Sequence, residues 1–479
     1  MTPTTQHSSP QGSTHTRRGR TTPPASIPAA PGTFAPLTHP LAMLRNPLAF
    51  VEGLHARGDL VRVRLGMTSA VVVCDPDLTH QVLLDDRTFD RGGALNERSR
   101  EVFGDGLATC PRGPHRRLRR LVQPAFHAAR LPADAQVMTD QIAAVTGTWH
   151  DGQLLDLSTE TMAITGRVMV TAMLSDTLSE STFRQAINDL TTVVNGIYRR
   201  MLLPSSVNAL PIPANRRYRQ AYTRLRHIIA ELITGCREGR AHPAPALKAL
   251  LDARDPDTDS VLSDAELTDN ILILFLAGME TTASVAHSAL NLLARNPEIE
   301  HALHTELDTV LAGRTAAYAD LPNLELTGRV ISETLRIYPP GWILTRTTTE
   351  DTELGGHRIP AGTTLACIPY LIQHRPDLFP DPDRFDPDRW LPQNATNIPR
   401  HAYLPFGAGA RKCIGDRFGA TEAALILATI ASRWQLRPPA NAHPGAHAAT
   451  SLRPAERRML LTARTPRPHA TTGHDAEEG

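Results

Sequence analysis

The sequence has few cysteines, few aromatic residues and no long apolar run. Its five cysteines are an odd number spread widely over 479 residues, so no disulfide framework and no C-x-x-C metal knuckle is visible. The longest apolar stretch, Ile271 to Met279, stops at Glu280, far short of the ~20 residues that span a bilayer. These absences argue against a secreted disulfide scaffold and a membrane anchor, and they favour a cytoplasmic protein.

Neither sign of charge dominates. Fifty Lys and Arg residues oppose 49 Asp and Glu residues, which gives a formal net charge of +1. Domains that bind nucleic acids are usually strongly basic, so this balance argues against a nucleic-acid partner. Three arginines at positions 17, 18 and 20 resemble a twin-arginine signal, but no apolar segment follows them, and we expect no signal peptide.

The two ends of the chain differ in composition from the rest. Residues 1–40 contain eight prolines, many Ser and Thr, and no acidic residue, and residues 466–479 are similarly polar. Such segments bury too little apolar surface to order themselves, so we predict disordered tails. Because no repeat or linker interrupts residues 41–465, they are predicted to form one large domain.

Local patterns predict a mainly α fold with a small β portion. Segments 60–66 and 69–76 have the alternating or β-branched pattern of strands, and helical patterns dominate from about 115 to 340. Gly and Pro turns break residues 352–370 into short strands. Prolines exclude regular structure from 377–393. A last helix is predicted over 415–434.

The most specific segment is Phe406–Gly415, with the skeleton Phe-x-x-Gly-x-Arg-x-Cys-x-Gly. A lone cysteine is most often a small buried apolar residue. Here the neighbouring glycines permit close backbone approach, so that N–H groups can point at the sulfur, and Arg411 and Lys412 add positive charge. The pattern therefore predicts that Cys413 is a stabilised thiolate. No base stands beside it in the sequence, which favours a metal ligand over a nucleophile.

This segment resembles the haem-binding loop of the cytochromes P450. The resemblance implies the P450 fold, a single haem domain holding haem b, and Cys413 as the axial thiolate ligand of its iron. A thiolate pushes electron density towards the iron and favours O–O cleavage, so the resemblance also implies a monooxygenase.

Further segments fit the same resemblance. Glu333 and Arg336 lie three residues apart on a helix that ends at Pro339-Pro340, and Arg389 follows in FDPDRW. Taken alone, the pair is typical of a weak surface ion pair. The resemblance implies instead a buried triad that braces the loop before the cysteine, a structural role.

The motif AGMETT (277–282) interrupts an apolar helix. It is also compatible with a helix that simply turns polar as it leaves the core, and Gly278 is unfavourable in a helix interior. The resemblance implies an oxygen pocket bordered by Ala277 and Gly278. It further implies that Thr281 breaks the helical hydrogen bonds locally and that Glu280 and Thr281 pass protons inward.

Cations must hold the two haem propionates. His115 and Arg119 lie on one face of a basic helix, which could also be only a solvated surface. The resemblance gives these two residues, Arg346 and Arg411 the role of propionate ligands. Many bacterial relatives carry a further His three residues before the loop Phe, where this chain has Tyr403.

The substrate is predicted to be a hydrophobic small molecule. Leu276, Ala277, Gly278, Ile343 and Leu344 are the candidate pocket residues, and their apolar character suits a hydrocarbon. Segments 196–221, 341–362 and 385–413 resemble actinobacterial sesquiterpene oxidases. This finer resemblance implies oxidation of a methyl group of the hydrocarbon pentalenene to an alcohol and then an aldehyde, in antibiotic biosynthesis. Fatty-acid and macrolide hydroxylases share the same motifs and remain alternatives.

Two reaction classes stay open at this stage. The first is a monooxygenase that uses O2 and electrons from a separate ferredoxin and ferredoxin reductase. The second is a haem–thiolate peroxygenase or isomerase. The Glu280–Thr281 pair favours the first, because a peroxygenase needs no such proton delivery. Arg411, Lys412 and Arg417 could contact an acidic partner, or could be only a propionate site and solvated charge.

Overall fold

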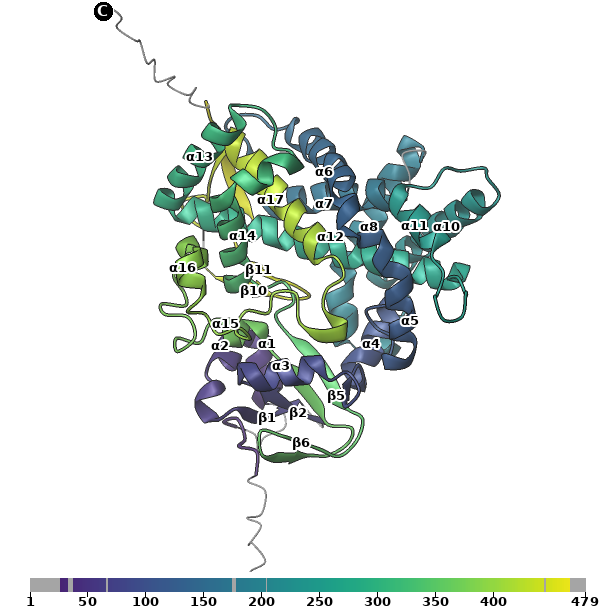
Figure 1. Ribbon diagram of the computed structural model, residues 1–479, viewed down its shortest axis with the longest axis vertical. Coiled ribbons are helices and arrows are strands. Elements are labelled where there is room, and N and C mark those ends of the chain that lie inside the picture. Colours follow the sequence, from purple (N-terminus) through teal and green to yellow (C-terminus); the bar gives the residue numbers. More distant parts are fainter. Residues whose placement is uncertain are drawn as a thin grey trace, which may run out of the picture.

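A long helix, α12 (Asp264–Arg295), runs through the middle of the computed structural model (Figure 1), which describes residues 26–32, 38–65, 68–174, 178–203, 205–442 and 445–465. The helix starts with a capping box between Ser263 and Glu266. Most of its residues on every side are buried, as expected for a helix that is apolar nearly all round and lies inside a core.

Helices make up most of the described chain, so the predicted mainly α class is confirmed. Prolines occupy the first or second position of many of these helices, where their missing N–H and fixed φ are tolerated. The other helices are α1 (Thr38–Arg45), α2 (Pro47–Glu52), α3 (Pro76–Leu84), α4 (Gly93–Phe103), α5 (Arg112–Val122), α6 (Leu131–Thr146), α7 (Leu157–Met173), α8 (Glu180–Leu202), α9 (Ser205–Ala209), α10 (Pro213–Arg237), α11 (Pro245–Asp252), α13 (Pro297–Leu311), α14 (Glu325–Ile337), α15 (Pro369–Gln373), α16 (Pro392–Ala395) and α17 (Asp416–Arg433), with the 3-10 turns η1 (His55–Arg57), η2 (Gln123–Phe126), η3 (Ala128–Arg130), η4 (Tyr318–Asn323), η5 (Pro387–Trp390) and η6 (Gly409–Arg411).

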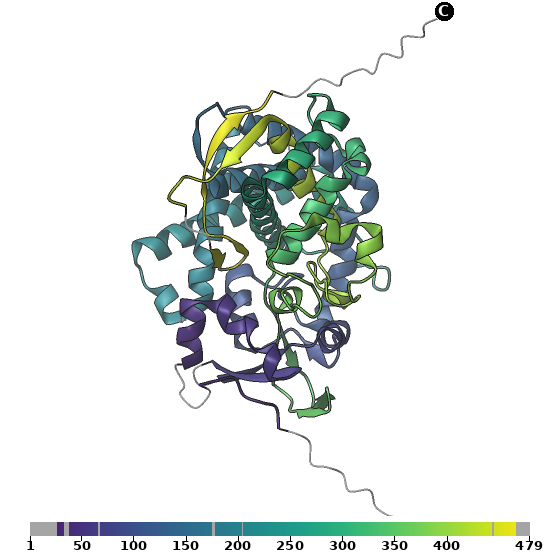
Figure 2. The ribbon, with the colours of Figure 1, turned by 90° about the vertical axis from the view of Figure 1, so that its left-hand side faces the viewer.

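Small sheets lie at two ends of the molecule. The larger has the order β1-β2-β8-β5-β3, with β2 and β8 parallel, and a three-stranded sheet has the order β4-β12-β9. In Figure 2 the yellow C-terminal strands lie opposite the purple N-terminal ones. The strands are β1 (Leu60–Leu65), β2 (Thr68–Val73), β3 (Phe89–Asp90), β4 (Leu154–Asp156), β5 (Leu344–Thr348), β6 (Thr352–Leu354), β7 (His357–Ile359), β8 (Thr364–Cys367), β9 (Trp434–Arg437), β10 (Ala446–Ala448), β11 (Leu452–Pro454) and β12 (Arg458–Ala463).

The ordered fold begins earlier than the predicted boundary at residue 40. Within residues 26–32, Ala30 N donates to Arg62 O at 2.9 Å, and Arg62 N donates to Pro28 O at 2.8 Å. Ala30 is buried, so this segment extends the edge of the sheet at β1. Ile27 and Ala30 pack against the neighbouring hydrophobic clusters. Most of the predicted tails, residues 1–25 and 466–479, lie outside the described residues.

Within the described chain, α12 is the one helix long and apolar enough to cross a membrane by composition. In its most apolar window, 83% of the residues are buried inside the protein, as in the core helix of a globular domain.

Candidate active site

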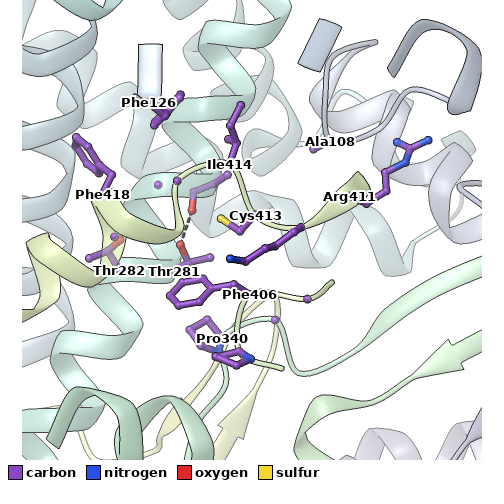
Figure 3. A pocket seen from close by; sticks show the side chains of 18 of the residues that line it. Ala108, Phe126, Thr281, Thr282, Pro340, Phe406, Arg411, Cys413, Ile414 and Phe418 are labelled. Carbon is purple, nitrogen blue, oxygen red and sulfur yellow. Dashed lines mark hydrogen bonds between the residues drawn. The ribbon is translucent and has the colours of Figure 1, made fainter. Parts of the chain in front are cut away.

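A deep cavity lies between the middle of α12 and the loop that carries Cys413 (Figure 3). It holds about 1580 Å³ of empty space, its opening included. Its walls come from α5, α7, α12, α14, the segment 340–346, the loop 404–415 and α17.

The glycines of the cysteine loop allow the close turns that aim Cys413 into the cavity. Gly407 and Gly409 have φ of +68° and +69°, and a Cβ on Gly409 would lie 2.3 Å from Leu83 O. Only glycine fits such a position without strain. Cys413 N donates to Phe406 O at 2.9 Å, which closes the loop. Of the five cysteines, Cys413 alone lines this cavity.

The electrostatics of Cys413 differ from the sequence expectation. The Cys413 side chain is exposed to the cavity, and desolvation by the residues around it is the largest influence and raises the pKa of its thiol. The N–H of Gly415 and the charges of Arg119 and Lys412 lower this pKa, as expected, but less strongly. The thiolate form of Cys413 therefore stays a prediction. Coordination to a metal ion would deprotonate the thiol outright.

Basic side chains gather at one edge of the cavity, among them the predicted His115, Arg346 and Arg411. Three of their buried nitrogens, His115 Nδ1, Arg411 Nε and Arg91 Nε, have no hydrogen-bond partner within the described residues. Buried donors normally have acceptors. The edge is therefore suited to an anionic group that reaches in from the cavity.

Burial and mutual repulsion lower the pKa values of two of these basic groups, which again suits the edge to an anionic group. Burial, followed by the charges of Arg346 and Arg411, lowers the pKa of Arg91 to about 9. Burial and the charges of Arg411 and Arg119 lower the pKa of His115 to about 4. Sequence reasoning missed Arg91, which stands in no recognisable motif.

Two of the predicted basic residues, Arg119 and Arg411, also donate hydrogen bonds to backbone carbonyls. Arg119 donates to Lys412 O at 2.5 Å, next to Cys413, and Arg411 donates to Cys110 O at 2.7 Å and to Asp90 Oδ1 at 2.8 Å. These two arginines therefore tie the cysteine loop to the segments before and within α5. Tyr403 lies outside the cavity lining and donates to Ser332 O.

The AGMETT turn of α12 lines the cavity through Ala277, Gly278 and Thr281, as predicted. The expected local break in the helix is absent, since α12 is continuous from Asp264 to Arg295. The Thr281 hydroxyl instead donates to Ala277 O at 2.5 Å, a bond that coexists with the helical ladder. Its lone pairs remain available to the cavity.

Glu280 does not line the cavity. Its buried carboxyl faces Ser451 and Arg453, at the start of β11. Burial raises the pKa of Glu280, while Ser451 and Arg453 lower it less strongly. Glu280 therefore points away from the cavity that Thr281 lines, because neighbouring residues on a helix are ~100° apart.

The apolar wall differs from the predicted one at two positions. Leu276 of α12 packs in the surrounding hydrophobic core, and Ile343 packs against the core around β1. Neither residue lines the cavity. Leu344, Ala277 and Gly278 do line it. The remaining apolar lining includes Leu107, Met169, Ile273, Leu274 and Val285, which sequence reasoning missed.

The predicted charged triad is assembled away from the cavity. Glu333 and Arg336 are fully buried, and Arg336 donates to both carboxyl oxygens, from Nε at 2.9 Å and Nη2 at 2.8 Å. Arg389 Nε donates to Glu333 at 3.2 Å. Trp390 Nε1 is a further donor at 3.0 Å that the motif did not reveal. One buried carboxylate thus holds α14 and η5 together.

A second contact connects this triad to the cavity wall. Arg336 Nη1 donates to Gln373 O at 2.9 Å, and Gln373 Nε2 donates back to Arg336 O at 2.9 Å. Gln373 Oε1 then accepts from the N–H of Leu404, a residue of the cavity lining, at 3.1 Å. These hydrogen bonds connect the triad to the segment before the cysteine loop, which explains how the triad can brace that loop.

Glu422 of α17 is a fully buried acid behind the cavity. The Thr282 hydroxyl faces it, but neither carboxyl oxygen has a partner at hydrogen-bonding distance within the described residues. Burial raises the pKa of Glu422 well above 4.5. The carboxyl therefore keeps its proton where an exposed glutamate has lost it.

We expect Glu422→Gln to fold and to change the pH dependence of stability. Above 4.5 the folded wild type holds a proton that the unfolded chain has released, so its stability falls as pH rises. The neutral amide lacks this dependence. The Tm difference, variant minus wild type, should increase from about pH 5 to about pH 8. Curves of Tm against pH that run parallel for the variant and the wild type would contradict this prediction. Glu325→Gln, at the exposed start of α14, is the control.

A mainly helical fold with one cysteine facing a threonine-bearing central helix, across a cavity with a cationic edge, is the arrangement of a haem–thiolate protein. The sequence profile of the family described as "Cytochrome P450" matches residues 31–461. The chain belongs to the cytochrome P450 family and is a P450 monooxygenase, which uses O2 and a redox partner.

Three similar proteins come from Streptomyces. The chain is 45% identical over 436 residues to the cyclooctatin synthase of Streptomyces melanosporofaciens, covering 91% of this chain and 93% of that protein. It is 43% identical over 439 residues to the pentalenene oxygenase of Streptomyces avermitilis, covering 91% and 97%. The cyclooctat-9-en-7-ol 5-monooxygenase of S. melanosporofaciens is 44% identical over 416 residues, covering 87% and 90%. A crystal structure of the cytochrome P450DA heme domain has the same fold, with a TM-score of 0.82, 24% identity and coverage of 92% and 98%.

The residues of the cavity fit the haem that this family implies. The cavity presents one cysteine thiol that could bind the iron, and the unpartnered nitrogens of Arg91, His115 and Arg411 could meet the need of the propionate carboxylates for donors. Within the described chain, no cluster of three His, Cys, Asp or Glu residues competes as a metal site.

Proposed function

We propose that Cys413 is the axial ligand of haem b and that His115, Arg119, Arg346 and Arg411 hold its two propionates, with Arg91 as a further ligand. Bound haem supplies the capacity to activate O2 for insertion into a C–H bond. The observation that supports these roles is the coincidence of one cavity-facing thiol with buried cations that lack acceptors.

Thr281 is the proposed proton-handling residue on the cavity wall. Its hydroxyl proton is engaged by Ala277 O, so its lone pairs can accept a hydrogen bond from a water molecule in the cavity. Such a water is then fixed in place as a proton source. Glu280, one residue earlier and with a raised pKa, stores a proton on the β11 side of the same turn.

The proposed substrate is a cyclic terpene, and pentalenene, oxidised at a methyl group to the alcohol and then the aldehyde, is the first compound to test. All three named relatives are terpene oxidases of Streptomyces. The cavity supports this class, because its polar groups lie at the cationic edge and around Thr281, while Leu107, Ile273 and Leu274 form an apolar wall. A hydrocarbon would be oriented by shape alone.

Electrons are proposed to come from a separate ferredoxin and its reductase. Outside the cysteine loop, a shallow hollow is lined by Arg116, Arg119 and Arg120, with Gly409 and Ala410 of the loop itself. Arg116 is exposed, Lys412 lies on the cysteine loop, and Arg417 lies in the first turn of α17. An acidic carrier would be attracted to this face.

The substrate assignment is tested by spectral titration with pentalenene, cyclooctat-9-en-7-ol, a long-chain fatty acid and a macrolactone. We expect one of the two cyclic terpenes to bind most tightly and, with ferredoxin, reductase and NAD(P)H, to be oxidised mainly at one carbon, as measured by mass spectrometry. Clean hydroxylation of the fatty acid or macrolactone alone would overturn the terpene class. Turnover with peroxide and none with reductant would move the protein to the peroxygenases.

A further inference from the structure

Helices α7 and α12 lie side by side (Figure 1). They interlock beside the cavity through two reciprocal glycine–methionine contacts. A Cβ on Gly278 of α12 would lie 2.7 Å from Sδ of Met169 of α7. A Cβ on Gly166 of α7 would lie 3.1 Å from Cε of Met279 of α12. Each helix therefore leaves a hole for the other's methionine, and both methionines are buried.

A hydrogen bond joins the same two turns. The hydroxyl of Thr165 donates to Met279 O at 2.9 Å and is shared with Thr161 O of its own helix at 3.1 Å. Thr165 is completely buried, so water cannot replace the bond. A helix carbonyl has a second lone pair, so Met279 O accepts this bond without leaving the helical ladder.

Met169 also lines the cavity, together with Gly278 and Ala277. Ala277 O holds the hydroxyl of Thr281 at 2.5 Å. One methionine side chain therefore touches the space for substrate on one side and, on the other, the turn of α12 that presents Thr281. Because the interior is close-packed, a change in the shape of Met169 is transmitted to that turn.

We infer that α7 sets the geometry of the Thr281 turn, with Thr165 as a positioning residue and Met169 as a specificity-determining residue. The inference rests on the proposed role of Thr281. Thr165 restrains the rotation of the turn through the Met279 carbonyl. Met169 shapes the wall against which an apolar substrate is oriented, so it selects which carbon is presented. Small misplacements near a reacting centre can cost about 100-fold in rate.

Thr165→Val tests the positioning role, since it keeps the shape and removes the hydroxyl. We expect product formed per NAD(P)H to fall about 5- to 10-fold, with peroxide taking its place, while haem content and substrate affinity stay near wild type. Thr165→Ser should restore the coupling. Hydrogen–deuterium exchange should rise over residues 277–283 in the valine variant and not in the serine variant.

Thr161→Val is the matched control on α7. Thr161 is equally buried, but its hydroxyl bonds only within its own helix, to Leu157 O and Ser158 O. If Thr161→Val uncouples the enzyme as much as Thr165→Val does, the effect is general softening of α7 and the inference is overturned. If Thr165→Val takes up no haem, Thr165→Cys, with its weaker donor, replaces it in the same assays.

Met169→Leu tests the specificity role, with Met173→Leu as its control. Met173 is also buried on α7 but does not line the cavity. We expect Met169→Leu to redistribute oxidation over more than one carbon and to change the substrate dissociation constant by less than about 10-fold, because one side chain contributes only modest discrimination. An unchanged product ratio in Met169→Leu, or the same change in Met173→Leu, would overturn this role.

Thr281→Ala separates this inference from the proposed function. Uncoupling by Thr281→Ala with full coupling in Thr165→Val would overturn the role of α7 and leave that of Thr281 standing. Full coupling in Thr281→Ala would overturn the proposed proton function itself.

Discussion

Cys413→Ala is expected to abolish the long-wavelength Soret band that marks a thiolate-ligated haem in the reduced, carbon-monoxide-bound protein. No other cysteine lines the cavity, so no second thiolate can take over the axial position. We expect complete loss of monooxygenase activity, measured with substrate, redox partners and NAD(P)H.

Cys236→Ala is the control for this experiment. Cys236 lies partly buried on α10, outside the cavity, and its replacement should leave the band and the activity unchanged. Cys413→Ala protein that kept the band, or a Cys236→Ala protein that lost it, would show that the axial ligand is wrongly assigned.

The contiguous motifs were the most predictable part of the site. The loop Phe406–Gly415 carries its own backbone requirements, and Gly407 and Gly409 do adopt the positive φ that the pattern indicated. The pair Glu333 and Arg336 is close in sequence and on one helix face, so its meeting required no knowledge of the fold. Arg389, which approaches from η5, could be included only through the resemblance to the family.

The direction in which single side chains point was much less predictable. Residues 271–276 of α12 are buried all round, so periodicity does not distinguish Leu274, which lines the cavity, from Leu276, which does not. The same holds at the start of β5, where neighbouring residues point to opposite faces and Leu344 rather than Ile343 reaches the cavity.

Polar contacts between residues far apart in the sequence were also not predictable. Arg91 belongs to no motif, and its role follows only from the folded neighbourhood of Arg346 and Arg411. Gln373 joins Arg336 to Leu404 across stretches of more than 30 residues, for which a single sequence contains no signal. The balance of burial against charge at Cys413 likewise depends on the complete fold.

Glu333→Gln is expected to prevent stable haem incorporation. The carboxylate accepts bonds from Arg336, Arg389 and Trp390, and from the N–H of Asp386 at 3.2 Å. An amide presents its own N–H group to some of these donors and leaves the two guanidinium groups without a counter-charge. Breaking a buried ion pair in this way costs about 3–5 kcal/mol, against a total stability of roughly 5–15 kcal/mol for a typical protein.

The chemically identical change Glu325→Gln, at the exposed first turn of the same helix, is the control and should leave haem content and Tm unchanged. The haem content of each purified variant is measured by its absorbance ratio, and Tm by circular dichroism. A haem-loaded Glu333→Gln protein with the Tm of the wild type would show that the triad does not brace the loop.

Removal of both partners separates the charge pair from the rest of the network. In Glu333→Gln/Arg336→Met, one of the two guanidinium groups left unpaired by the first change is gone, so the double variant should be less destabilised than the sum of the two single ones, by about 0.5–3 kcal/mol. Rescue should stay incomplete, because Arg336 also donates to Gln373 O and Arg384 O, and Gln373 in turn holds Leu404 at the cavity wall. Full rescue would show that only the balance of charge matters. Strict additivity would show that Glu333 and Arg336 stabilise the protein independently, and the contact from α14 through Gln373 to the cysteine loop would then need another explanation.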